Sequence, residues 1–157
     1  MEAIQTERLT LRNFGAEDWR DLHEMIVQYQ ASEYAQYDRA WPTSEEEIQG
    51  VAQWFSQGDS FLAVCLRSTG KVIGLVALNE EEREDGPARN LGYIFHSDFY
   101  GQGYATEACR AAIAYAFERL GETRLVTGTH PDNLPSRRLL GRLGFREIAD
   151  EVYVLER

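Results

Sequence analysis

Two stretches of this sequence have the residue types and the spacing to bind an anion. The first is Tyr100–Ala108, YGQGYATEA, in which Gly101 and Gly103 precede a helical pattern. Glycine lets a ligand approach the backbone closely, and the first turn of a helix offers unpaired N–H groups at the positive end of its dipole. Such a loop suits a phosphate or a pyrophosphate. The alternative is that the glycines only ease a corner between a strand and a helix.

Two better-known phosphate motifs are excluded by the residues around these glycines. The dinucleotide-binding fingerprint requires a third glycine at the position of Thr106. The P-loop requires a Gly-Lys pair, and Lys71, the only lysine of the chain, lies far from this loop.

The second stretch, Asn133–Phe145, reads NLPSRRLLGRLGF and is rich in arginine. Four arginines fall within ten positions of one another: Arg137, Arg138, Arg142 and Arg146. The net charge is −10, and residues 1–85 carry 17 acids against 7 bases, so a basic group in such a chain indicates a local anion site, with a solvated helix face as the alternative. Nucleic acid is not an expected partner, because this much negative charge repels its phosphates.

Size and composition bound the remaining possibilities. With 157 residues, we expect one domain spanning 1–157. No apolar run is long enough to span a bilayer, and the first twelve residues do not have the layout of a signal peptide. Two cysteines, Cys65 and Cys109, are too few for a disulfide framework, so we expect a reduced cytoplasmic protein. The three histidines have no metal-ligand spacing, and we expect no metal.

The expected elements place both stretches at the N-termini of helices. Hydrophobic periodicity predicts helices at Ala16–Gln30, from Ser44, over Ala105–Leu120 and over Asn133–Leu143. Strands are predicted at Arg8–Phe14, Phe61–Arg67, Lys71–Asn79, Arg89–His96 and Thr123–Thr129, with at most two short strands after Phe145. The acidic stretch Glu80–Pro87 is predicted to be a turn. This order indicates an α+β protein, an antiparallel meander followed by one crossover helix.

The two stretches, in this order and at this spacing, resemble the GNAT acyl-CoA N-acyltransferase family. The opening TERLTLRNF is also similar to the first strand of the branch that includes the ribosomal-protein N-terminal acetyltransferases. The resemblance spans nearly the whole chain. It implies an α+β fold with a mixed, mostly antiparallel central sheet and helices on both faces. It also implies acetyl-CoA as co-substrate.

The resemblance also implies which residues hold acetyl-CoA. Backbone N–H groups of the glycine loop would bind the pyrophosphate, and the backbone of Phe95 and His96 would bind the pantetheine arm where two parallel strands splay apart. Arg137 or Arg138 would meet the phosphates, including the 3′-phosphate. The coenzyme-binding residues expected on this basis are Phe95, His96, Gly101, Gln102, Gly103, Tyr104, Ala105, Thr106, Asn133, Arg137 and Arg138. For Asn133, a helix N-cap is the alternative role.

Ser136 and Asn90 occupy the two positions at which groups for proton transfer are expected. By resemblance, Ser136 lies near the coenzyme sulfur and protonates the departing thiolate, and an ordinary first-turn serine is the alternative. Many relatives carry a glutamate as general base at the position of Asn90, which cannot be a base but can hold a water. Glu80, Glu81 or Glu82 could take the proton instead, with a solvated turn as the alternative.

The connection between the first two helices supplies the expected acceptor pocket: Glu33, Tyr34, Tyr37, Asp38 and Trp41. Aromatic and acidic side chains suit a small cationic amine or a peptide N-terminus, and packing of this segment against the body is the alternative. The expected function is acetyl transfer to such an amine by direct transfer in a ternary complex. Two other classes stay open: an acyl-CoA sensor without turnover, and an interaction protein whose arginines dock an acidic partner. The assembly is left open, with a homodimer considered.

Overall fold

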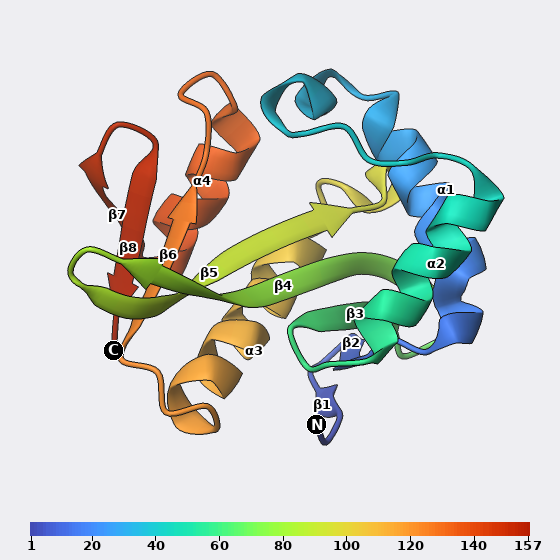
Figure 1. Cartoon of the computed structure of the whole chain (residues 1–157), viewed down its shortest axis with the longest axis horizontal. Coiled ribbons are helices and arrows are strands. Elements are labelled where there is room, and N and C mark those ends of the chain that lie inside the picture. Colours follow the sequence, from blue (N-terminus) through green and yellow to red (C-terminus); the bar gives the residue numbers. More distant parts are fainter.

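A single mixed β-sheet of eight strands organises the chain. The computed structural model describes residues 1–157, and the strands run side by side in the order β1-β2-β3-β4-β5-β6-β8-β7 (Figure 1). Their bounds are β1 Ile4–Gln5, β2 Leu9–Asn13, β3 Phe61–Leu66, β4 Val72–Arg83, β5 Gly86–Phe95, β6 Arg124–Gly128, β7 Arg146–Ala149 and β8 Val152–Glu156. Every neighbouring pair is antiparallel except β5 and β6, which are parallel.

Helices cover both faces of this sheet. They are α1 Trp19–Gln30, α2 Glu45–Ser56, α3 Tyr104–Glu118 and α4 Leu134–Leu143, with 3₁₀ turns η1 Ala16–Asp18, η2 Glu33–Tyr37 and η3 Ser97–Phe99. The predicted starts and stops are confirmed where the caps are specific. Ser44 accepts a hydrogen bond from the N–H of Glu47, and Gly144 ends α4 in the left-handed conformation. No helix has the length and hydropathy needed to cross a membrane.

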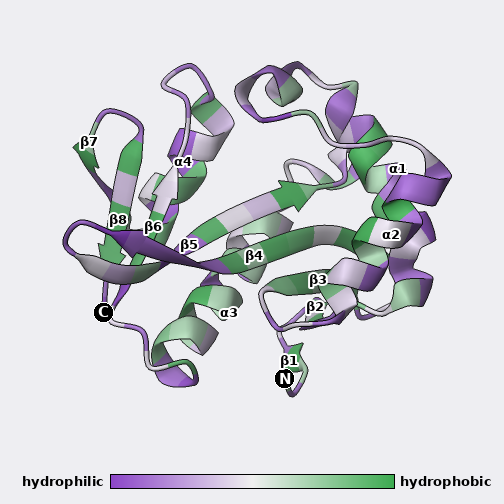
Figure 2. Ribbon diagram, in the orientation of Figure 1, coloured by the Kyte–Doolittle hydropathy of each residue, from purple (hydrophilic) through white to green (hydrophobic).

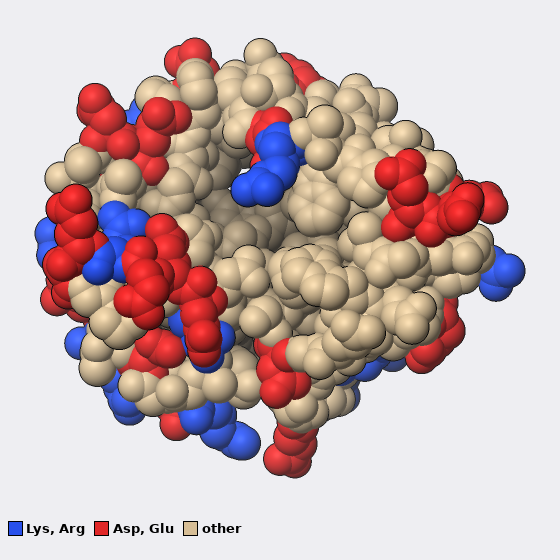
Figure 3. Space-filling view, viewed as in Figure 1, with Lys and Arg blue, Asp and Glu red and all other residues tan.

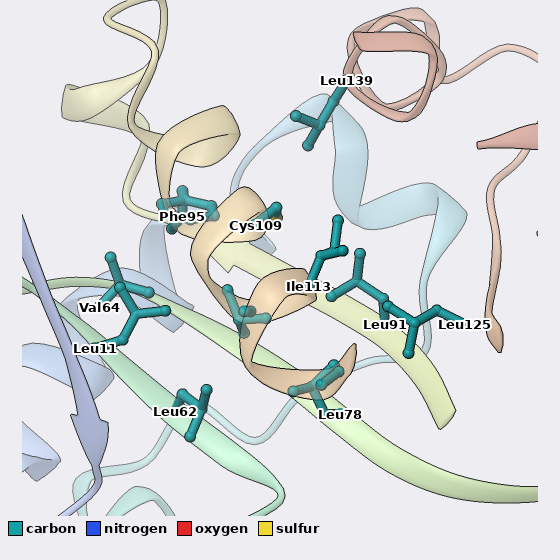
Figure 4. Packing of buried hydrophobic residues seen from close by; sticks show 14 of the residues in the cluster. Leu11, Leu62, Val64, Leu78, Leu91, Phe95, Cys109, Ile113, Leu125 and Leu139 are labelled. Carbon is teal, nitrogen blue, oxygen red and sulfur yellow. The ribbon is translucent and has the colours of Figure 1, made fainter. Parts of the chain in front are cut away.

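Two hydrophobic clusters hold the helices against opposite faces of the sheet. Ala108, Cys109 and Ala112 of α3 pack with Leu11, Leu62, Leu78 and Leu91 of the strands, and Leu139 and Leu140 of α4 join the same cluster (Figure 4). On the other face, Leu22, Ile26, Ile48 and Phe55 of α1 and α2 pack on Ala63, Leu75 and Ile94. The α+β fold with helices on both faces is therefore confirmed.

The predicted turn at Glu80–Pro87 is wrong. Strand β4 runs on to Arg83, and only residues 84–85 turn before β5 begins at Gly86. The acidic residues form strand because each has a ladder partner: Glu80 pairs with Arg89 and Glu82 with Pro87. Figure 2 shows the change along β4 from a hydrophobic half beside the helices to a hydrophilic arm. Strand β1 was not predicted at all.

Strands β5 and β6 part soon after they meet, and this opens the sheet. Only Arg89 and Asn90 of β5 pair with β6, opposite Leu125 and Val126. One further contact follows, in which the Thr127 hydroxyl donates to the Leu91 carbonyl at 2.7 Å. Beyond Leu91 on β5 and Thr127 on β6, the two strands make no hydrogen bond with each other. The glycine loop, the 3₁₀ turn η2 and helix α4 all border this gap.

Candidate functional site

A cavity of about 920 Å³ lies where β5 and β6 diverge. Its walls are residues 90–95 of β5, residues 127–130 after β6, the N-terminus of α3, the inner face of α4 and the segment around η2. Figure 3 shows the surface hollowed on the side where these elements meet, mostly between uncharged atoms. The two stretches identified from the sequence thus border one space, as the resemblance implied.

The glycine loop presents unpaired amides to this cavity. Gly101 and Gly103 have φ of 75° and 84°, a left-handed conformation that side chains with Cβ rarely adopt. The amides of Gly101–Gly103 donate no backbone hydrogen bond, and the first bond of α3 is the one from Glu107 N–H to the Gly103 carbonyl. The N–H groups of Tyr104, Ala105 and Thr106 precede that bond and are the free donors of the helix start. This arrangement fits a pyrophosphate.

An ion-paired network from the turn between β1 and β2 holds this loop in place. Glu107, in the first turn of α3, accepts hydrogen bonds from the Thr6 hydroxyl, the Arg8 backbone N–H at 2.9 Å and Arg8 Nε at 2.8 Å. Arg8 Nη1 then donates to the Gln102 carbonyl at 2.9 Å, and its guanidinium lies 4.1 Å from the centre of the Tyr104 ring. The Gln102 carbonyl is therefore bound by Arg8, and Gln102 is not part of the cavity wall.

Of the four arginines, Arg142 is the one that reaches the cavity. Its Nε donates to the hydroxyl of Thr106 at 3.3 Å, which places the guanidinium beside the glycine loop. Arg137 instead donates to the Tyr153 hydroxyl and the Pro131 carbonyl. Arg137 and Arg138 line a separate groove of about 340 Å³. From the sequence, Arg142 was one of the basic group, but Arg137 or Arg138 was expected at the phosphates. The spacing Ser136, Leu139, Arg142 puts Arg142 on the helix face that lines the cavity.

Ser136 lies in the first turn of α4, where Asn133 caps the helix. The Asn133 side chain accepts from the Ser136 N–H at 3.4 Å, so the cap role is present, and both residues also line the cavity. The Ser136 hydroxyl lies 2.6 Å from the hydroxyl of Tyr93 on β5. Tyr93 was not singled out from the sequence. The alternation of side chains along β5 could have indicated it, because this alternation puts Tyr93 on the same face of the strand as Leu91 and Phe95.

Of the residues on or just after β5 that were expected at the site, Asn90 and Phe95 line the cavity and His96 does not. Asn90 Nδ2 donates to Glu81 at 2.9 Å. His96 is buried, its N–H donates to the Ile73 carbonyl, and its own carbonyl accepts from the Phe99 N–H. Its backbone therefore already has partners within the fold.

The aromatic segment around η2 closes one side of the cavity. Tyr37 stacks on His130, with ring centres 4.6 Å apart, and Tyr34 approaches Tyr100 at 6.4 Å. Tyr34 and Tyr37 line the cavity, whereas Glu33 and Trp41 do not. Trp41 packs edge-on against Phe55 of the second core cluster, as the packing alternative predicted.

Asp38 is held in the cavity wall by its neighbours. Its Oδ2 accepts from the Tyr29 hydroxyl at 3.0 Å and from Trp41 Nε1 at 3.4 Å. Burial and the nearby Asp38 carboxylate raise the pKa of Tyr29, so its phenol stays protonated as the donor. Asp38 is the only acidic residue lining the cavity, and Arg142 is the only arginine or lysine. The cavity thus carries one fixed charge of each sign, attached to different elements.

Comparisons with known proteins identify the family and the fold of this chain. A family model described as Acetyltransferase (GNAT) domain matches residues 8–146. The chain is 30% identical over 154 residues to the uncharacterized N-acetyltransferase p20 of Bacillus licheniformis, an alignment covering 94% of this chain and 84% of the relative.

Solved structures show the same fold. A GNAT-family acetyltransferase from Bacillus anthracis superposes with a TM-score of 0.83 at 22% identity, covering 99% of this chain and 98% of that one. RimL, a ribosomal L7/L12 alpha-N-protein acetyltransferase in complex with coenzyme A, superposes with a TM-score of 0.78 at 22% identity, covering 99% and 98%.

Proposed function

This chain belongs to the GNAT acetyltransferase family and is an N-acetyltransferase, and we propose that it moves the acetyl group of acetyl-CoA directly to a primary amine within a ternary complex. The observation that carries the proposal is the charge arrangement of the one cavity. Free amides and Arg142 belong to the glycine-loop side of the wall, and Asp38 with Tyr34 and Tyr37 belongs to the segment around η2. An anionic coenzyme and a cationic amine can therefore occupy it together.

The glycine loop and α4 are the proposed coenzyme-binding surface. The amides from Gly101 to Thr106 would hold the pyrophosphate, and Arg142 would add a charge-assisted hydrogen bond. Asn133 and the backbone of β5 near Phe95 would hold the arm. The thioester of acetyl-CoA supplies the activated acetyl group. Arg137 and Arg138 lie outside this cavity, so their predicted contact with the 3′-phosphate requires the nucleotide end to extend over the outer face of α4.

The proposed step is attack of a neutral amine nitrogen on the acetyl carbonyl carbon. A new N–C bond forms, the C–S bond breaks with its electron pair going to sulfur, and Ser136 Oγ gives its proton to that sulfur. The nitrogen loses one proton through water held by Asn90 toward Glu81. Asn90 alone cannot accept a proton, and its hydrogen bond to Glu81 connects the cavity to a carboxylate.

Direct transfer is favoured over an acetyl-cysteine intermediate by the state of both thiols. Neither cysteine lines the cavity. Burial raises the pKa of the Cys109 thiol to about 12, and burial also raises the pKa of Cys65. A buried thiol with a raised pKa is a poor nucleophile. The two free thiols also support the proposal of a reducing, cytoplasmic location.

The proposed acceptor is a peptide N-terminus or a small cationic amine. Asp38 would bind the ammonium form before it loses its proton, and the rings of Tyr34 and Tyr37 favour cations over their faces. The RimL relative is described as acting on the alpha-amino group of a ribosomal protein, which supports the peptide over the small amine.

The experiment is release of free thiol from acetyl-CoA in the presence of amines. We expect release with a peptide that carries a free N-terminus, and none with the same peptide acetylated at its N-terminus and free of lysine. A small cationic amine forms the third arm. Acetyl-CoA should also raise the melting temperature, because it binds only the folded chain. A melting shift without thiol release from any amine would contradict catalysis and favour the sensor without turnover.

A further inference from the structure

We propose that Tyr93 is a positioning residue that aims the hydroxyl proton of Ser136 at the leaving sulfur and replaces that proton after transfer. This inference rests on the proposed function, in which Ser136 is the proton donor. It starts from one contact: the Tyr93 hydroxyl lies 2.6 Å from Ser136 Oγ, and both residues line the cavity. Nothing in the sequence motifs pointed to Tyr93.

Each hydroxyl of this pair has one protein partner, the other hydroxyl. Tyr93 Oη makes no hydrogen bond except the one with Ser136, and Ser136 Oγ makes none except the one with Tyr93. Either oxygen can be the donor on geometry alone. If one hydroxyl donates to the other, the proton of the accepting hydroxyl stays free. Which proton stays free decides whether Ser136 can donate to a ligand.

Donation by the phenol is the better arrangement once the cavity is filled. A phenol is a stronger acid than an alcohol and is therefore the better donor of the two. If Ser136 donated instead, the Tyr93 proton would be left without a protein acceptor. If Tyr93 donates, its proton is satisfied, and the Ser136 proton is free to turn into the cavity. Burial raises the pKa of Tyr93 although the hydrogen bond with Ser136 lowers it, so the phenol carries its proton at neutral pH. The Tyr93 hydroxyl therefore donates to Ser136, and the Ser136 hydroxyl donates to the ligand.

The location of the pair suits this role. Tyr93 lies on β5 past the last residues that pair with β6, and Ser136 lies in the first turn of α4, so the contact crosses the gap between the diverging strands. When Ser136 Oγ gives its proton to sulfur, it takes the phenolic proton of Tyr93. The phenolate then regains a proton from solvent after the products leave. No proton is gained or lost over the cycle, because the amine releases one and the sulfur keeps one.

The test is a double-mutant cycle on kcat with Tyr93→Phe, Ser136→Ala and the double variant. Tyr93→Phe removes only the phenolic oxygen and should lower kcat about tenfold, with KM for acetyl-CoA changed by less than about twofold. Ser136→Ala should lower kcat by about tenfold to a thousandfold. The double variant should be no slower than Ser136→Ala, because Tyr93 acts only through Ser136.

Tyr115→Phe is the matched control. Tyr115 is a half-buried tyrosine of α3 outside the cavity, and its hydroxyl has no hydrogen-bond partner, so its removal should leave kcat unchanged. Melting curves on each variant separate turnover from stability.

Three results would overturn the inference. Full turnover by Tyr93→Phe beside a slow Ser136→Ala would remove Tyr93 from the chemistry and leave the proposed role of Ser136 intact. If the double variant were slower than Ser136→Ala by the same factor by which Tyr93→Phe is slower than wild type, the two effects would be independent, and Tyr93 would act as a separate donor. Full turnover by Ser136→Ala would remove both the proposed role of Ser136 and the role of Tyr93 that depends on it.

Discussion

Gly103 and Arg142 show how single residues shape the glycine-loop side of the cavity. At Gly103 the left-handed φ lets the chain turn into α3 with its amides facing the cavity, and a Cβ there would also lie 3.4 Å from Arg8 Nη2. Sequence pattern could identify the loop, because glycine spacing and a helix start are local features. It could not choose among the four arginines, because that depends on which face of α4 turns inward.

Arg142→Ala should weaken coenzyme A binding by about tenfold, which corresponds to the loss of one charge-assisted hydrogen bond. The loss should be equal for coenzyme A and for its 3′-dephospho form, because Arg142 contacts Thr106 of the glycine loop, which we propose binds the pyrophosphate. Titration calorimetry measures both. Arg146→Ala, which removes an exposed arginine paired with Glu156, is the control and should bind normally. A selective loss for coenzyme A would instead put Arg142 at the 3′-phosphate.

At the scale of elements, helix α3 connects the glycine loop to the N-terminal strands. Its apolar spacing made it the most secure prediction, and Cys109 and Ile113 do face the sheet. The hydrogen bonds from Thr6 and Arg8 to Glu107 join residues about a hundred positions apart in the sequence and were not predicted. Local periodicity cannot show such a contact, since it depends on where β2 lies beneath the helix.

The Glu107 network makes part of the stability dependent on pH. Burial raises the pKa of Glu107, but hydrogen bonds from Thr6 and Arg8 outweigh it and hold the pKa below its usual value. The stabilisation is therefore complete above the ordinary glutamate pKa of about 4.3 and is lost as pH falls through the lower folded-state pKa. At pH 7, Glu107→Gln should cost about 1–3 kcal/mol of unfolding free energy.

Urea unfolding of wild type and Glu107→Gln from pH 7 to pH 3 measures this difference. It should shrink as pH falls below about 4. Glu118→Gln, on the exposed side of the same helix and without an ion-pair partner, should cost little at any pH. A Glu107→Gln deficit that stays constant down to pH 3 would mean that the carboxylate charge does not stabilise the fold.

The acidic arm of β4 and β5 shows why one element was predicted wrongly. Glu80–Glu82 and Glu84–Asp85 have turn-like composition, yet most of them form strand. Arg89 donates to Glu80 and Glu122, and Arg124 pairs with Asp85, so cross-strand charges offset the repulsion along the arm. Those partners come from distant positions, and composition within one window does not reveal them.

Over the whole molecule, the candidate site lies between two parts of one sheet. Strands β1–β5 with α1 and α2 form one side, strands β6–β8 with α4 form the other, and two residue pairs between β5 and β6 connect them within the sheet. Across the opening, Tyr37 meets His130. The order of elements and the family resemblance predicted this fold. The meeting of η2 with the loop after β6 was not predictable, since neither segment has a regular pattern.

The central claim is that this one cavity holds acetyl-CoA and the amine together, and two-substrate initial-velocity kinetics tests it most directly. Thiol release is measured over a matrix of acetyl-CoA and peptide concentrations. A ternary complex predicts double-reciprocal lines that intersect, because neither product can leave before both substrates are bound. Parallel lines would contradict the account, because they would require an acetylated enzyme that persists after coenzyme A has left.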